Sequence, residues 1–191
     1  MSLPAKLVTA LEKSNQSYEV LKHRVVYTAY DLASTLHVPE LSIVKTLLVK
    51  TERGLVVALL SAAHNLNLTK FLKIAKVKKA IILKEKDMVA LLKLGKKPLA
   101  SFGSIYRVPV LLEKALLKNK LAVFSGASFT HSVQMRVKDF LLFENPTLGL
   151  FGSAKKLPKK KQVKKNVKKK PMKKAVKRNA KKAVYPRRIR K

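Results

Sequence analysis

The segment from Leu55 to Ala62, LVVALLSA, is apolar at consecutive positions instead of alternate ones. A strand with one solvated face alternates apolar and polar residues, whereas a strand covered on both faces need not. The segment Ile43 to Lys50, IVKTLLVK, is also rich in branched apolar residues, and the link TERG places Gly54 at a turn position. These patterns predict a central β-hairpin in a sheet with helices packed on both faces.

The other periodic segments predict helices and strands around this hairpin. Helical spacing or turn chemistry favours helices over residues 2–13, 29–38, 66–76, 85–95 and 138–143, with a helical turn at 114–117. Branched apolar runs favour strands over residues 17–23, 78–84, 108–113, 121–126 and 132–137. The elements lack a regular βαβ repeat, and there is no P-loop or dinucleotide-binding glycine fingerprint. We expect a mixed α/β (α+β) domain with a mixed sheet flanked by helices.

Positive charge divides the chain into two parts. The chain has 43 Lys or Arg against 10 Asp or Glu, a net charge of +33. Residues 154–191 hold 20 of these bases and no acid, so residues 1–153 carry a net charge of +13. The first part has enough apolar residues to bury a core, which predicts a folded domain over residues 1–153. The tail, residues 154–191, repels itself and contains Pro158, Pro171 and Pro186, so we expect it to be disordered in the free protein.

A tail of this composition is a ligand for polyanions. Its basic clusters include Lys159, Lys160, Lys161, Lys168, Lys169, Lys170, Arg187 and Arg188. Lysine outnumbers arginine, which favours attraction to phosphates over reading of bases, and the spacing resembles the lysine-rich tails of histone-H1-like proteins. We expect binding to tRNA and to other RNA or DNA. The alternatives are a solubilising appendage and, without an amphipathic aromatic face to support it, a membrane surface.

Composition also limits the chemistry. Cysteine is absent, and the four histidines show no metal-binding spacing, so we expect no metal and no cofactor. No apolar run reaches the roughly 18 residues that span a bilayer, and the N-terminal sequence lacks the apolar stretch of a signal peptide. We expect a soluble cytoplasmic protein without a membrane partner.

Lys45 interrupts the apolar segment Ile43 to Val49. An ammonium group that faced the core there would be costly without compensation. One interpretation is structural: Lys45 reaches water, or pairs with an acid, near the end of its strand. The other is functional: Lys45 projects from a rigid strand into a partly dry cleft, where it binds a phosphate or a substrate carbonyl.

The surroundings of Lys45 resemble a known family. The string VKTLLV, with a helix before it and a turn and an apolar strand after it, is similar to the Lys-Thr-Leu signature of the YbaK and prolyl-tRNA-synthetase-associated domain, a family of aminoacyl-tRNA editing deacylases. Further similarities follow in order: His23 before Thr28-Ala29 and a helix, the segment LSAAHNLNLTKFLKIAKVKKA, FGS at 102–104, VPVLLE ending in Glu113, SGAS at 125–128 and MRVKDF. The resemblance spans about residues 4–142.

The resemblance implies a function and a set of site residues. Members hydrolyse the ester that joins a wrong amino acid to the tRNA 3′ end, without a metal or a protein nucleophile. Whether this chain has a synthetase partner is left open by the sequence. The family's indispensable lysine corresponds to Lys45, which would position the ester and offset charge on the oxyanion. The residues expected to bind substrate are Thr46, His23, Thr28, Phe102, Gly103, Ser104, Gly126 and Ser132. Phe129 is expected, like Phe102, to form a pocket wall.

This sequence departs from the family pattern at two places. The family's loop reads Gly-x-x-x-Pro, whereas here Gly103 is followed at the fourth position by Arg107, and Pro109 comes two residues later. Ser132 falls near a position that is acidic in some relatives. Two functions therefore remain open: a freestanding trans-editing deacylase, or a non-enzymatic DNA- or RNA-binding protein that uses a degraded editing fold and its cationic tail.

Overall fold

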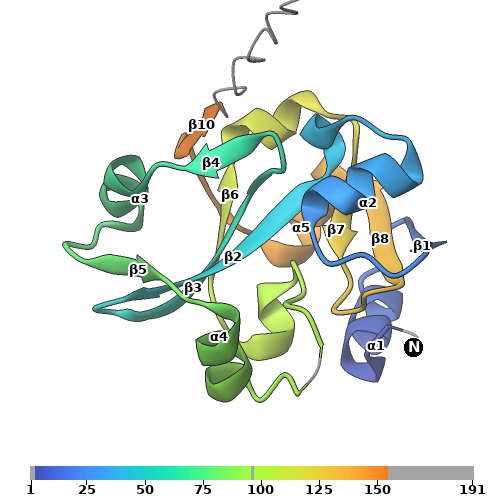
Figure 1. Cartoon of the computed structure of the whole chain (residues 1–191), viewed down its shortest axis with the longest axis horizontal. Helices are drawn as coiled ribbons and strands as arrows, with labels where there is room; N and C mark the ends of the chain where they lie inside the picture. Colours follow the sequence, from blue (N-terminus) through green and yellow to red (C-terminus); the bar gives the residue numbers. More distant parts are fainter. Residues whose placement is uncertain (1–2, 96, 155–191) are drawn as a thin grey trace, which may run out of the picture. The chain divides into compact units, whose positions relative to one another are not determined.

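A computed structural model describes residues 3–95 and 97–154 (Figure 1). The helices are α1 (Ala5–Lys13), α2 (Ala29–Leu36), α3 (Leu68–Ala75), α4 (Glu85–Leu92) and α5 (Val137–Glu144), with 3-10 turns η1 (Glu40–Ser42), η2 (Gly103–Tyr106) and η3 (Lys114–Lys118). The strands are β1 (Tyr18–Lys22), β2 (Val44–Thr51), β3 (Gly54–Ser61), β4 (His64–Leu66), β5 (Ala80–Ile82), β6 (Val110–Glu113), β7 (Leu121–Ser125), β8 (His131–Arg136), β9 (Thr147–Gly149) and β10 (Gly152–Ala154).

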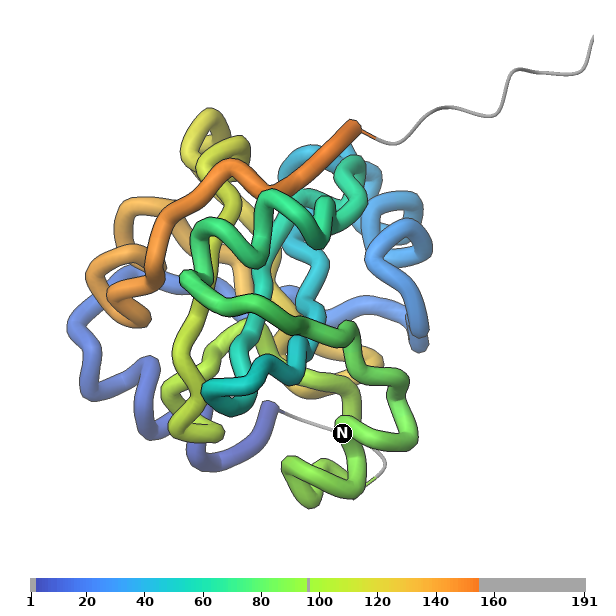
Figure 2. Tube along the Cα trace, turned by 90° about the vertical axis from the view of Figure 1, so that its left-hand side faces the viewer, coloured from blue at the N-terminus to red at the C-terminus, as the bar shows by residue number. Residues whose placement is uncertain are grey.

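The largest sheet has the order β5-β2-β3-β6-β9 and is mixed, which confirms the expected fold class. The predicted hairpin is its centre: β2 and β3 pair antiparallel from Val44↔Ser61 to Thr51↔Gly54. The β3–β6 and β6–β9 pairs are parallel. A second sheet, β1-β8-β7, is antiparallel, and β10 pairs with β4. Figure 2 shows the last described strand running beside the segment that contains β4.

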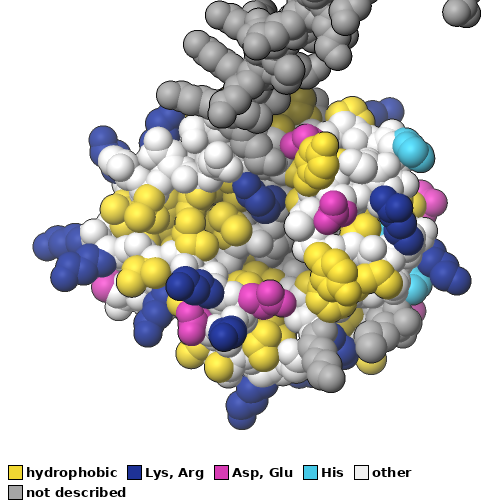
Figure 3. Space-filling model, viewed as in Figure 1, with side chains coloured by type: hydrophobic (Ala, Val, Ile, Leu, Met, Phe, Trp, Pro, Cys, Tyr) yellow, Lys and Arg dark blue, Asp and Glu magenta, His cyan; other side chains and the backbone are white. Residues whose placement is uncertain are grey.

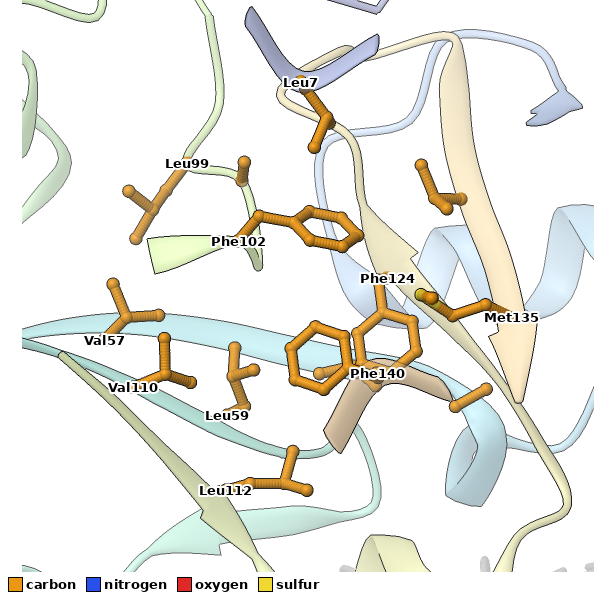
Figure 4. Close-up of a cluster of buried hydrophobic side chains, with 14 of the residues drawn as sticks. Leu7, Val57, Leu59, Leu99, Phe102, Val110, Leu112, Phe124, Met135 and Phe140 are labelled. Atoms are coloured by element: carbon orange, nitrogen blue, oxygen red, sulfur yellow. The ribbon is translucent and has the colours of Figure 1, made fainter. Parts of the chain in front are cut away.

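Both faces of β3 are buried, as the continuous apolar run predicts. Val57 and Leu59 pack into the larger cluster, together with Phe102, Phe124 and Phe140, which face one another in Figure 4. The rings of Phe124 and Phe140 stack with centroids 4.2 Å apart. Val56, Ala58 and Leu60 pack on the opposite face against Phe71 and Phe151. The hairpin is therefore held between two apolar layers, which makes it a rigid support for side chains at its ends.

Element ends differ from the sequence prediction where local polar contacts decide them. Helix α3 starts at Leu68 because the Asn67 side chain accepts a hydrogen bond from Lys70 N, and Leu66 lies in β4 instead. Helix α4 ends at Leu92, with Lys93 in the left-handed conformation, so the predicted end at Gly95 is wrong by three residues. The short strands β4, β9 and β10 have no periodic sequence signal and were not predicted.

The described residues end at Ala154, close to the expected boundary between the domain and the basic tail. The expected division after Ser153 falls inside β10, which runs from Gly152 to Ala154. Residues 155–191 lie outside the described residues, so the expected disorder and the basic clusters between Lys159 and Arg188 stay predictions. Within the described residues, no helix is both long and apolar enough to cross a membrane.

Candidate functional site

A cavity of about 420 Å³ opens beside the first residues of β2. Its walls come from β2, the N-terminus of α2, the β7–β8 connection, α4 and residues 97–99. One edge of β2 pairs with β3 along its whole length, whereas on the other edge β5 pairs with residues 49–51. Ile43, just before β2, forms a bridge with Val123 of β7. The cavity lies beside residues 44–46, between these two contacts. Figure 3 shows hydrophobic side chains in separate patches on the face that carries β2 and α2, with lysine and arginine both between the patches and around the edge.

Lys45 lies in the wall of this cavity and is partly buried. Side chains alternate along β2, so Lys45 shares its face with Leu47 and Val49, whereas Val44 and Leu48 enter the larger core cluster. Its Nζ donates a hydrogen bond of 2.5 Å to the backbone carbonyl of His64. The ammonium group is therefore tethered at the cavity wall by a backbone carbonyl.

A hydrogen bond to a buried carboxylate holds the side chain of His64, the residue whose carbonyl binds Lys45. Glu113, at the end of β6, is only 2% exposed, and both of its carboxylate oxygens lie 2.9 Å from Nδ1 of His64. The Nδ1–H of His64 donates to this carboxylate, which fixes the orientation of the imidazole ring. The carbonyl that binds Lys45 belongs to the backbone of β4, which pairs with β10. Sequence reasoning missed the contact between His64 and Glu113 because its two members lie 49 positions apart. A buried acid at the end of an apolar strand was the only available signal.

His23 and Ser132 meet at the cavity. His23 Nε2 lies 3.0 Å from Ser132 Oγ, and its Nδ1 lies 2.8 Å from the carbonyl oxygen of Arg24. Ser132 is 3% exposed and lines the cavity, while His23 stands behind it. The structure therefore brings together two residues that the resemblance assigned to the pocket, one in the wall and one as its support.

Two threonines also lie in the wall, in different roles. Thr28 caps α2: its Oγ1 accepts from Asp31 N at 3.0 Å and donates to the Asp31 carboxylate at 2.7 Å. Both functions of that hydroxyl are used locally. Thr46 Oγ1 instead lies 2.7 Å from Ser101 Oγ. Phe129 also lines the cavity, with its ring centroid 5.2 Å from that of Tyr27.

The glycine loop and Phe102 do not line this cavity. Phe102 is fully buried and packs on Phe124, Phe140 and Phe143, because its neighbours form a continuous aromatic core. Gly103 is buried against the Val108 carbonyl, and a Cβ there would lie 2.4 Å from that oxygen. The structure therefore gives Phe102 and Gly103 packing roles and brings neither into the wall with Lys45.

Ser104 and Gly126 lie elsewhere as well. The Ser104 hydroxyl donates to the Glu144 carboxylate at 2.5 Å, outside the cavity wall. Gly126 is buried where a Cβ would lie 2.3 Å from Leu3 Cδ2. Both positions are explained by local packing and loop hydrogen bonds.

The backbone explains the missing proline of the loop. Arg107 has φ of +58°, which is left-handed. A proline ring fixes φ near −65°, so proline cannot occupy position 107 in this conformation. The loop closes through Val108 N donating to the Gly103 carbonyl at 3.0 Å, and the Tyr106 hydroxyl accepts from Ala100 N at 3.0 Å. Burial raises the pKa of Tyr106, so its hydroxyl stays protonated. The loop therefore differs in shape from a Gly-x-x-x-Pro loop.

Glu144 fastens this loop and makes its stability depend on pH. Burial raises the pKa of Glu144 above 4.5, although hydrogen bonds from Ser104 and Gly103 oppose the shift. The folded state thus holds the proton more tightly than the unfolded state, and the stabilisation present below pH 4.5 is lost as the pH rises through the raised pKa. Relative to Glu144→Gln, the wild type should lose stability over this range. We expect less than about 1.4 kcal/mol, since the carboxyl is partly solvated.

Chemical denaturation of both proteins from pH 4 to 7 measures this difference. Glu144→Gln keeps an acceptor oxygen for Ser104, so a difference that stays constant with pH would contradict the assignment.

No cluster of three or more His, Asp or Glu side chains suited to a metal ion occurs within residues 3–95 and 97–154. The cavity instead offers Lys45, hydroxyl groups and backbone. These groups can position a bound group and stabilise charge that develops on it.

The model of one protein family, described as the aminoacyl-tRNA editing domain, matches residues 23–143, which include Lys45 and every element that lines the cavity. The chain belongs to this family. Its fold is also similar to that of a candidate trans-editing enzyme for prolyl-tRNA synthetase, with a TM-score of 0.68, 18% identity, and coverage of 80% of this chain and 100% of that chain. No curated protein sequence matches the chain.

Two other solved structures share the editing-domain fold. The hypothetical protein APE2540 has a TM-score of 0.67 and 17% identity over 78% of this chain and 99% of its own. A scaffold protein used for epitope backbone grafting has a TM-score of 0.68 and 18% identity over 78% of this chain and 96% of its own. At these identities the likeness shows the fold alone, while the family match supports a deacylase-like role for the chain.

Proposed function

We propose that this protein is a freestanding aminoacyl-tRNA deacylase that hydrolyses the ester between a wrong amino acid and the tRNA 3′ end. The observation that supports it most is the position of Lys45, tethered to the His64 carbonyl in the wall of a 420 Å³ cavity. A cavity of this volume lies within the usual range for small-ligand sites and suits an aminoacyl group with part of its terminal nucleoside. The family membership supplies the reaction class.

The proposed reaction needs no covalent intermediate on the protein. The oxygen of a water molecule, or a hydroxyl of the substrate, attacks the ester carbonyl, and negative charge develops on the carbonyl oxygen. The Lys45 ammonium group offsets this charge and holds the ester or the adjacent phosphate in place. The bond to the ribose oxygen then breaks, and that oxygen takes the proton that the attacking group loses. After attack by water the free amino acid and uncharged tRNA leave; after attack by a hydroxyl of the amino-acid side chain, a cyclic ester and uncharged tRNA leave.

A panel of mischarged tRNAs tests the proposal. The full chain should release amino acid from at least one member of the panel faster than the buffer does, with release followed by radiolabel or mass spectrometry. If every ester survives while tRNA, other RNA and DNA bind alike, the chain is a nucleic-acid binder built on an editing fold and the proposal fails.

The basic tail is proposed to hold the tRNA substrate electrostatically. Residues 155–191 carry 20 Lys or Arg, and such a segment raises the local concentration of RNA around the domain without reading its sequence. Removing these residues should flatten the salt dependence of tRNA binding, because each phosphate that the protein no longer neutralises reduces the log–log slope by roughly 0.7 to 0.9.

Filter binding or fluorescence titration from 50 to 300 mM salt measures this slope for the two proteins. A truncated chain that keeps the full slope would show that the domain itself, and not the tail, carries the binding surface.

A further inference from the structure

The hydrogen-bond partners of His23 determine what Ser132 presents to the cavity. His23 Nδ1 faces a backbone carbonyl, which can only accept, so Nδ1 carries the hydrogen. In the neutral imidazole, Nε2 then has a lone pair, and Ser132 Oγ at 3.0 Å must donate its only hydrogen to it. Ser132 is left with lone pairs alone, so it presents an acceptor to the cavity.

Ser125 has the same polarity. Its hydroxyl donates to the Leu99 carbonyl at 2.7 Å, and Ser125 also lines the cavity. Ser125 and Ser132 are directly opposite each other in the β7–β8 pair, so their side chains stand on the same face about 4.5–5.5 Å apart at Cβ. On the side of the cavity formed by β7 and β8, the hydroxyl oxygens of Ser125 and Ser132 are therefore neighbouring hydrogen-bond acceptors.

The β2 wall has the opposite polarity. Ser101 is fully buried, and its Oγ accepts from Ser125 N at 2.9 Å. Among the described residues, the acceptor within reach of the Ser101 hydroxyl hydrogen is Thr46 Oγ1 at 2.7 Å. A buried hydroxyl that kept its hydrogen unbonded would be penalised, so Ser101 donates and Thr46 retains its own hydrogen for a ligand. Thr46 and Lys45 point to opposite faces of β2, but both line the cavity at the edge of this strand, so the β2 side of the cavity offers donors.

We infer that this cavity selects esters of amino acids whose α-amino group is free. The α-ammonium group has three hydrogens and would bind the acceptors Ser125 and Ser132, while the ester carbonyl would face the donors Lys45 and Thr46. This inference rests on the proposed function and names its substrate class. An N-acylated ester has lost the charge and two of the three hydrogens, and it places a bulky acyl group against the serine wall.

The test compares one mischarged tRNA with its N-acetylated form. The full chain should hydrolyse the free-amino form with a kcat/KM roughly 10- to 100-fold higher, the effect expected of hydrogen bonds to a charged group. Ser132→Ala should reduce this ratio by about tenfold, and Ser132→Thr, which keeps the hydroxyl, should retain most of it. His23→Ala should also reduce it, because Ser132 can then turn its hydrogen toward the ligand.

The ratio is measured on a single preparation, so a variant that is partly unfolded does not change it. Ser42→Ala is the matched control: Ser42 Oγ also donates to a backbone carbonyl, that of Pro39, but Ser42 does not line the cavity. This variant should leave the ratio unchanged. Equal hydrolysis of the two substrates by the wild type would overturn the inference and leave the deacylase proposal standing.

Glu85 provides the rival explanation, since its exposed carboxylate also lines the cavity. A ratio that collapses in Glu85→Gln and persists in Ser132→Ala would overturn the serine assignment. If the wild type hydrolyses neither substrate, the deacylase proposal fails, and calorimetry with a non-hydrolysable 3′-aminoacylamido-adenosine and its N-acetyl derivative still decides the inference. Tighter binding of the free-amino compound supports it, and equal binding or no binding contradicts it.

Discussion

Lys45→Ala is expected to lower the rate of deacylation by about 10²- to 10³-fold, the usual effect of removing a group that stabilises an oxyanion. The loss should appear in the first-order rate constant measured in single turnover with saturating protein, because the ammonium group acts on charge that develops during the reaction. Affinity for uncharged tRNA should change little, since the chain retains 42 of its 43 basic residues.

Lys50→Ala provides the matched control. Lys50 lies on the same strand, is exposed, and is not part of the cavity wall. The Lys50→Ala variant loses the same charge without a change in the cavity. Its rate of deacylation should stay within about twofold of the wild type, as expected for a surface substitution away from the core and the site. Equal losses in the two variants would mean that net charge, and not the position of Lys45, governs the rate.

Gly152→Ala is expected to destabilise the domain by about 3 kcal/mol, the upper end of the usual cost of overpacking a core, because the side chain in the way is a buried, hydrogen-bonded carboxylate. A Cβ at this position would lie 1.8 Å from Glu113 Oε1. Glu113 cannot yield freely, because its carboxylate is buried and held by His64. A shift of β10 would also disturb β4, whose His64 carbonyl tethers Lys45, so activity should fall in the molecules that remain folded.

Gly149→Ala serves for comparison. The three atoms nearest to a Cβ there all belong to the side chain of Ile74, the closest at 2.5 Å, and an aliphatic side chain can shift at a smaller cost. Denaturant unfolding of both variants measures the two costs. In the double variant Glu113→Ala/Gly152→Ala, the alanine at position 152 should cost much less than it does alone. A Gly152→Ala protein as stable as the wild type would contradict the close approach of β10 to Glu113.

Much of the fold was predictable because its long elements carry their own signals. The apolar runs at residues 43–50 and 55–62 predict the hairpin and the burial of both its faces, and Thr28 predicts the start of α2 through its capping side chain. The strands β4, β9 and β10 are three residues long each and form only because the chain brings them beside a partner. Such pairing depends on tertiary structure, which no local pattern records.

The candidate site was predictable in part for the same reason. Lys45 stands out as a cation in an apolar strand, and Thr46, Thr28 and Ser132 line the cavity with it. Phe102 and Gly103 were expected there because they resemble a family loop, but a left-handed Arg107 gives this loop another shape. The partnerships of His64 with Glu113, and of Ser101 with Thr46, join residues about 50 positions apart and have no sequence signature.

The most direct test of the central claim locates the aminoacyl end of the substrate on the protein. Isotope-labelled full chain is titrated with a non-hydrolysable 3′-aminoacylamido-adenosine, and backbone amide shifts are followed by NMR. We predict that the largest changes occur at Lys45, Thr46, Ser125 and Ser132, and that Lys45→Ala weakens them. Changes confined to other surfaces, with the amides around Lys45 unmoved at saturation, would contradict the account.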